Sequence, residues 1–63
     1  MGSPRAELAR LVLDTLANGN RVSFHDAIQL RKWAVSPEDA MLPLAEIARR
    51  ILDQEADTDA AEA

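Results

Sequence analysis

The hydrophobic positions of this 63-residue chain recur with a helical period, and no strand-like alternation interrupts them. The clearest segment lies near the end of the chain, where the apolar positions are Leu44, Ile47, Ala48, Ile51 and Leu52. This spacing predicts an amphipathic helix with one buried side. On its polar side Glu46 and Arg50, and Arg49 and Asp53, are spaced i, i+4, as ion pairs on a solvated face are.

The first helix is predicted over residues 4–17. Ser3 and Pro4 supply an N-cap and a proline at the first helical position, and the segment 18–20 (Asn-Gly-Asn) supplies a stop. Its main apolar stripe is formed by Leu8, Leu11, Val12, Thr15 and Leu16. A second, shallower apolar flank contains Leu13 and Ala17, with Ala9 alongside. Two apolar flanks indicate two neighbours for this helix.

A second helix is predicted over residues 24–35. Ser23 and Asp26 are spaced as a capping box, with Asp in place of the usual Glu or Gln, and Val22 can pack on Ala27 as a hydrophobic staple. At 100° per residue one broad apolar arc contains Phe24, Ala27, Ile28, Leu30, Ala34 and Val35. Trp33 falls on the opposite side of this helix, which predicts that it is exposed.

Two prolines divide the rest of the chain. Ser36 and Pro37 repeat the N-cap and first-turn signal, and Pro43 ends the short helix predicted over residues 37–42. Pro43 then opens a fourth helix over residues 43–54. A single helix over 37–54, kinked at Pro43, is the alternative. The sequence therefore predicts an all-α fold, a small bundle of three to four helices.

Charge separates the folded part from a tail. Five of the eleven acids lie from Asp53 onward with no Lys or Arg among them, which leaves six acids against seven bases in the rest of a chain of net charge −4. Such an acidic, weakly apolar end is typical of disordered segments. We expect a single helical domain over residues 1–55 and a disordered acidic tail over 56–63.

Composition excludes several classes of function. No run approaches the roughly 20 apolar residues of a membrane span, so a cytoplasmic protein is expected. His25 is the only histidine, cysteine is absent, and the two glycines form no phosphate-binding loop. Ser23, His25 and Asp26 lie too close on one turn to act as a hydrolase triad. The sequence predicts no enzyme activity, no cofactor or metal, and no small-molecule substrate.

Binding is the remaining class. Trp33, Leu13 and Ala17 are candidate residues of a protein interface, since an exposed Trp and a spare helix flank are typical of interaction surfaces. Arg21, Arg31, Lys32 and Trp33 are candidate RNA-binding residues, because an aromatic beside basic side chains is typical of nucleic-acid contacts. A Trp packed between helices and solvated charges is the alternative interpretation of these four.

Two segments resemble a known family. The runs 26–34 and 44–51 resemble the second half of the ANTAR domain, a small helical module of bacterial antitermination regulators. The matching positions are Leu30, Arg31, Ala34, Leu44, Ile47, Ala48 and Ile51. The resemblance implies binding of a structured RNA leader, usually by a dimer, with Arg31, Lys32 and Trp33 as the residues that contact RNA.

Two functional hypotheses follow. The first is a non-catalytic helical module for protein interaction in a bacterial regulatory or assembly context. It would self-associate, since a domain of this size buries little of its surface by itself. The second is an ANTAR-like RNA-binding domain that acts in transcription antitermination.

Overall fold

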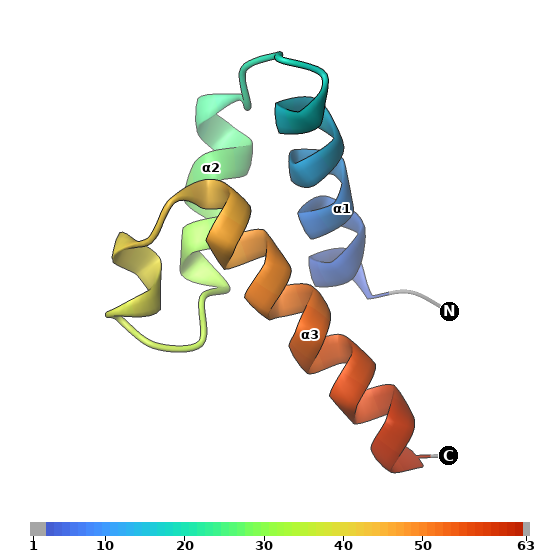
Figure 1. Cartoon of the computed structure of the whole chain (residues 1–63). Helices are drawn as coiled ribbons and strands as arrows, with labels where there is room; N and C mark the ends of the chain where they lie inside the picture. Colours follow the sequence, from blue (N-terminus) through green and yellow to red (C-terminus); the bar gives the residue numbers. More distant parts are fainter. Residues whose placement is uncertain (1–2, 63) are drawn as a thin grey trace.

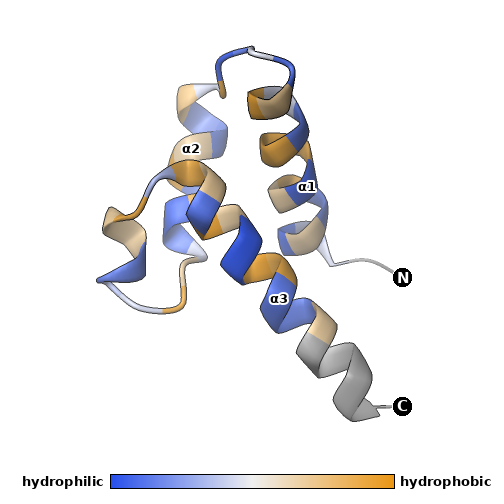
Figure 2. Ribbon diagram, in the orientation of Figure 1, coloured by the Kyte–Doolittle hydropathy of each residue, from blue (hydrophilic) through white to orange (hydrophobic). Residues whose placement is uncertain are grey.

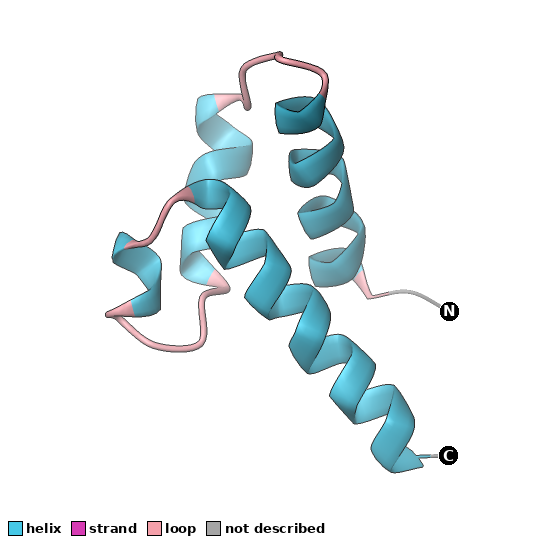
Figure 3. Cartoon of the chain, in the orientation of Figure 1, coloured by secondary structure: helices cyan, strands magenta, loops and turns pink. Residues whose placement is uncertain are grey.

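The computed structural model describes residues 3–62, and the side chains of residues 3–56. It contains the helices α1 (Pro4–Ala17), α2 (Phe24–Lys32) and α3 (Leu44–Glu62), and a 3-10 turn, η1 (Asp39–Met41), between α2 and α3. Every regular element over the described residues is helical (Figure 3), which confirms the predicted all-α bundle. α1 and α2 lie side by side, and α3 crosses both of them (Figure 1).

The predicted start signals are confirmed. The hydroxyls of Ser3, Ser23 and Ser36 each accept a hydrogen bond from the backbone N–H three residues later, at 3.1–3.2 Å. These bonds satisfy donors that the first turn leaves without a helical partner. The return half of the capping box, from the Asp26 carboxylate to Ser23, is not among the contacts of the described residues. That carboxylate lies 3.7 Å from Nδ1 of His25.

α1 ends where predicted, through a Schellman motif. Gly19 has a φ of +77°, its N–H donates to Leu16 O, and Asn20 N–H donates to Thr15 O. Glycine adopts this left-handed conformation without the steric cost that a side chain adds. The motif turns the chain back toward the start of α2.

α2 ends at Lys32, three residues before the predicted end at Val35. At this end the N–H of Ala34 donates to the carbonyl of Arg31 rather than to that of Leu30, at 3.2 Å. Pro37 also has no N–H to donate to the carbonyl of Trp33, four residues earlier. Nη2 of Arg5, from α1, donates to that carbonyl instead, at 3.1 Å. The prediction of a helix over 24–35 was therefore too long at its C-terminal end.

The predicted helix over 37–42 is reduced to η1. Leu42, the residue before Pro43, is extended, with φ −74° and ψ 161°, because proline disfavours helical geometry in the residue that precedes it. The interruption separates η1 from α3 and excludes the alternative of one kinked helix. α3 begins at Leu44 and continues to Glu62, past the predicted end at residue 54. The predicted disordered tail falls mostly on residues 57–63, which lie outside the described side chains.

The core lies where the three helices meet. Its fully buried members are Ala9, Val12, Leu30, Ile47, Ala48 and Ile51. Leu44 and Leu52 pack against them, so the predicted apolar side of the last helix is confirmed. Alanine from both α1 and α3 occupies this cluster, and small side chains at a helix contact let the two helix axes approach closely.

The buried sides of α1 and α2 match the predicted ones only in part. On α1 the buried residues are Ala6, Ala9 and Val12, whereas Leu11, predicted in the main stripe, is 55% exposed. On α2 Leu30 is the one buried residue, and Phe24 and Ile28, both predicted in the apolar arc, face solvent. Each predicted arc was right in part, since Val12 of the α1 stripe and Leu30 of the α2 arc are in the core. The error lay in the largest apolar side chains, because packing against α3 buries the alanine-rich side of α1.

Candidate interaction surface

The outward side of α2 carries two large apolar residues. Phe24 is 81% exposed and Ile28 is 38% exposed, and their i, i+4 spacing places them next to each other on one face of the helix. The opposite face of α2 carries Leu30 into the core. Two adjacent exposed apolar side chains form a small contiguous patch, and contiguous patches, unlike single scattered residues, are typical of interaction surfaces.

Arg31 extends this surface to η1. It lies three residues after Ile28, on the same side of α2, and its Nη1 donates to the carbonyl of Ala40 in η1. The next residue, Met41, is 84% exposed. We name Phe24, Ile28, Arg31 and Met41 the α2–η1 band. η1, which carries apolar residues, lies at the side of the molecule away from the contact between α1 and α3 (Figure 2).

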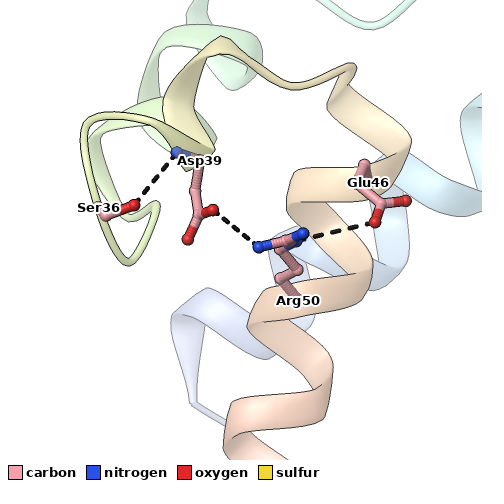
Figure 4. A network of polar contacts seen from close by, with 4 residues as sticks. All are labelled: Ser36, Asp39, Glu46 and Arg50. Atoms are coloured by element: carbon pink, nitrogen blue, oxygen red, sulfur yellow. Dashed lines mark hydrogen bonds and ion pairs between the residues drawn. The ribbon is translucent and has the colours of Figure 1, made fainter.

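A polar network fixes η1 against α3 (Figure 4). The Asp39 carboxylate accepts from Nη1 of Arg50 at 2.8 Å, and Nε of Arg50 lies 3.7 Å from the Glu46 carboxylate. The backbone N–H of the same Asp39 donates to the hydroxyl of Ser36. Because η1 is tied at its start by Ser36 and Arg50 and in its middle by Arg31, Met41 is presented from an anchored turn.

Trp33 does not belong to the band. It is the C-cap of α2, half-buried, and packs against the core, and its carbonyl accepts from Arg5. The expectation that Trp33 is exposed was wrong, because the backbone after Lys32 turns away from the helix and α1 contributes Arg5 at this point. The alternative interpretation, a Trp packed between helices, matches the structure.

The four candidate RNA-binding residues do not form one surface. Arg31 and Lys32 lie exposed on the last turn of α2, and Arg21 is exposed before the start of the same helix. Arg21 precedes α2, whereas Arg31 and Lys32 lie at its far end, and Trp33 packs against the core. The arrangement therefore lacks an aromatic platform beside its cations.

The two candidate interface residues on α1 lie at different depths. Leu13 is half-buried and lines an open depression of about 310 Å³ between α1 and α3, together with Arg49, Leu52 and Asp53. Ala17 is exposed at the end of α1. Both leucines of this depression already pack against the core. It therefore offers less uncovered apolar surface than the α2–η1 band.

Phe24, Ile28 and Met41 are exposed residues that the predicted sites do not include. A signal was present, because Ala27, Leu30 and Ala34 have helical i, i+3, i+7 spacing and share a side with Trp33. That narrower arc is the one that packs, since Leu30 is buried and Trp33 and Ala34 contact the core. The two alanines have low hydrophobicity, whereas Phe24 and Ile28 have high hydrophobicity, so the predicted arc was centred on Phe24 and Ile28.

Comparison with protein-family models, curated proteins and solved structures finds no match to this chain. The resemblance to the ANTAR domain stays a prediction. Within the described residues, no helix has an apolar stretch of the length that a membrane crossing needs. The same part of the chain holds no group of three His, Cys, Asp or Glu side chains placed to bind a metal ion.

Proposed function

We propose that this chain is a non-catalytic, cytoplasmic protein-interaction module that self-associates through the α2–η1 band. The observation that carries the proposal is the exposure of Phe24 on a face that it shares with Ile28. Covering a Phe or Ile side chain contributes roughly 1.5–3 kcal/mol when burial is complete. A partner that covers the band gains most of this free energy from Phe24, which is 81% exposed, and a smaller part from Ile28, which is 38% exposed.

A second copy is the partner that the size of the domain favours. A chain of 63 residues that folds alone buries only about 60% of the surface of its unfolded state, a lower share than larger domains bury. Association of folded copies stabilises the folded state by mass action. The band supports this role because its apolar residues lie on a helix and a turn that Arg31, Arg50 and Ser36 already hold in place. Little conformational entropy is therefore lost on binding.

Sedimentation velocity over a series of protein concentrations tests the proposal. The wild-type chain is expected to shift from a 6.9 kDa species toward twice that mass as concentration rises. Phe24→Gln is expected to remain monomeric with unchanged far-ultraviolet circular dichroism. Leu11→Gln is the matched control, since Leu11 is also a large, exposed apolar residue but lies on α1, outside the band. This variant is expected to associate as the wild type does.

Two outcomes would count against the proposal. A chain that stays monomeric at every concentration removes the self-associating role. Co-sedimentation with bulk RNA at low salt, abolished by Lys32→Glu and weakened steeply by added salt, would favour the RNA-binding alternative instead.

A further inference from the structure

We infer that two copies pair through α2 in antiparallel orientation, around a two-fold axis near Ile28, so that each Phe24 ring lies against the partner's Arg31 and Met41. This inference rests on the proposed self-association and specifies its geometry. It follows from the order of side chains along the outward face of α2.

That order is aromatic, aliphatic, cationic. Phe24 begins the helix, Ile28 lies at its middle, and Arg31 and Lys32 occupy its last turn, all exposed. A parallel pair would bring the two Lys32 side chains together, and facing like charges weaken an interface. An antiparallel pair brings the cationic end of each copy to the aromatic end of the other. The face is therefore complementary to itself in one orientation only.

The spacing supports the same axis. Phe24 lies four residues before Ile28, and Lys32 lies four residues after it, so rotation about Ile28 exchanges the two ends of α2. At 100° per residue Phe24 and Arg31 lie on one flank of the face, and His25 and Lys32 lie on the other. Each flank then meets the same flank of the second copy, which places Phe24 beside the partner's Arg31 and His25 beside the partner's Lys32.

The groups that would meet Phe24 suit an aromatic ring. A guanidinium over an aromatic face contributes roughly 0.5–2 kcal/mol, and a methionine sulfur near the ring edge contributes about 0.3–1.5 kcal/mol. Arg31 is held by the carbonyl of Ala40, and Met41 follows directly in the chain. Both groups are therefore positioned before association, which lowers the entropy lost when the ring docks between them.

Disulfide trapping tests the orientation, because the chain has no cysteine of its own. His25→Cys and Lys32→Cys each change an exposed residue and leave Phe24, Ile28, Arg31 and Met41 intact. After mild thiol oxidation, an equal mixture of the two variants is expected to form a covalent dimer. Each variant alone is expected to form little covalent dimer, since the helical rise separates like positions by about 9 and 12 Å along the axis, beyond the 4.4–6.8 Å between Cα atoms that a disulfide spans.

The outcomes separate this inference from the proposed function. Covalent dimers from each variant alone would show a parallel pair and overturn the antiparallel geometry while self-association stands. A dimer in sedimentation with no cross-link in any sample would place the interface away from α2, which also overturns the inference. A monomer in sedimentation removes the proposed function and the inference together.

Discussion

The contact between α1 and α3 and the outer side of α2 use apolar residues in opposite ways. At the first, Ala9, Ile47, Ala48 and Ile51 are fully buried. At the second, α2 contributes Leu30 to the core and leaves Phe24 exposed, and η1 leaves Met41 exposed. The difference teaches that the fold is stabilised mainly on the α1–α3 side. The α2–η1 side has apolar surface left for a partner.

Polar contacts hold the α2–η1 side in place. Arg5 of α1 binds the carbonyl at the end of α2, Arg31 of α2 binds the carbonyl of Ala40, and Arg50 of α3 binds Asp39. Each arginine joins a different pair of segments. Such contacts fix position while they bury little apolar area, which explains how η1 is anchored and exposed at the same time.

The largest expected effect breaks the α1–α3 side. Ile51→Ala is expected to lower the free energy of unfolding by about 2–5 kcal/mol, because it removes a fully buried side chain and leaves a cavity. Domains have roughly 0.05–0.15 kcal/mol of stability per residue, so this loss is a large share of what a chain of 63 residues has. Urea unfolding followed by far-ultraviolet circular dichroism measures it.

Phe24→Gln is the control for this comparison. At a protein concentration low enough to keep the chain monomeric, its free energy of unfolding is expected to stay within about 0.5 kcal/mol of the wild type, as for other exposed positions. Equal losses in the two variants would contradict the division of the molecule into a stabilising side and a partner-binding side.

A smaller effect sharpens the role of the polar contacts. Asp39→Asn keeps the backbone N–H that Ser36 caps and removes the charge that faces Arg50. It is expected to lower the free energy of unfolding by about 0.2–1 kcal/mol, the usual range for a solvent-accessible ion pair. The difference from wild type should shrink when salt is added, because salt screens the pair.

Glu46→Gln provides the comparison for Asp39→Asn. Glu46 meets the same arginine at a longer distance, 3.7 Å against 2.8 Å, and both partners there are about half exposed. Its effect is expected to be the smaller of the two. A larger effect from Glu46→Gln would mean that the pair within α3, rather than the contact to η1, is the important use of Arg50.

Local signals in the sequence predicted the elements, and tertiary contacts decided their faces. The serine hydroxyls, Gly19 and Pro43 act within a few residues and make the local contacts that the sequence predicts, although η1 begins at Asp39 rather than at Pro37. The carbonyl at the end of α2 accepts from Arg5, 28 residues away in the chain, and no local pattern contains that contact.

The candidate site was predicted less well than the fold for the same reason. The predicted apolar arc of α2 contained Phe24 and Ile28, but which side of a helix is buried depends on where its neighbours pack. α3 packs against the side that carries Leu30, and this leaves the largest apolar residue of the arc in solvent. The arc identified the right residue types and assigned them to the core.

The smallest expected effect checks the corresponding correction on α1. Leu11→Gln is expected to change the free energy of unfolding by no more than about 0.5 kcal/mol, although Leu11 lies in the apolar stripe that the sequence predicts. Leu13→Gln is the matched variant, two residues away on the same helix, where the side chain is half-buried and packs against the core. Placing an amide there leaves polar atoms partly desolvated, so its cost is expected to be clearly larger. If Leu11→Gln were the more damaging of the two in urea unfolding, α1 would bury its predicted stripe, and the alanine-lined contact with α3 could not be the stabilising side of the molecule.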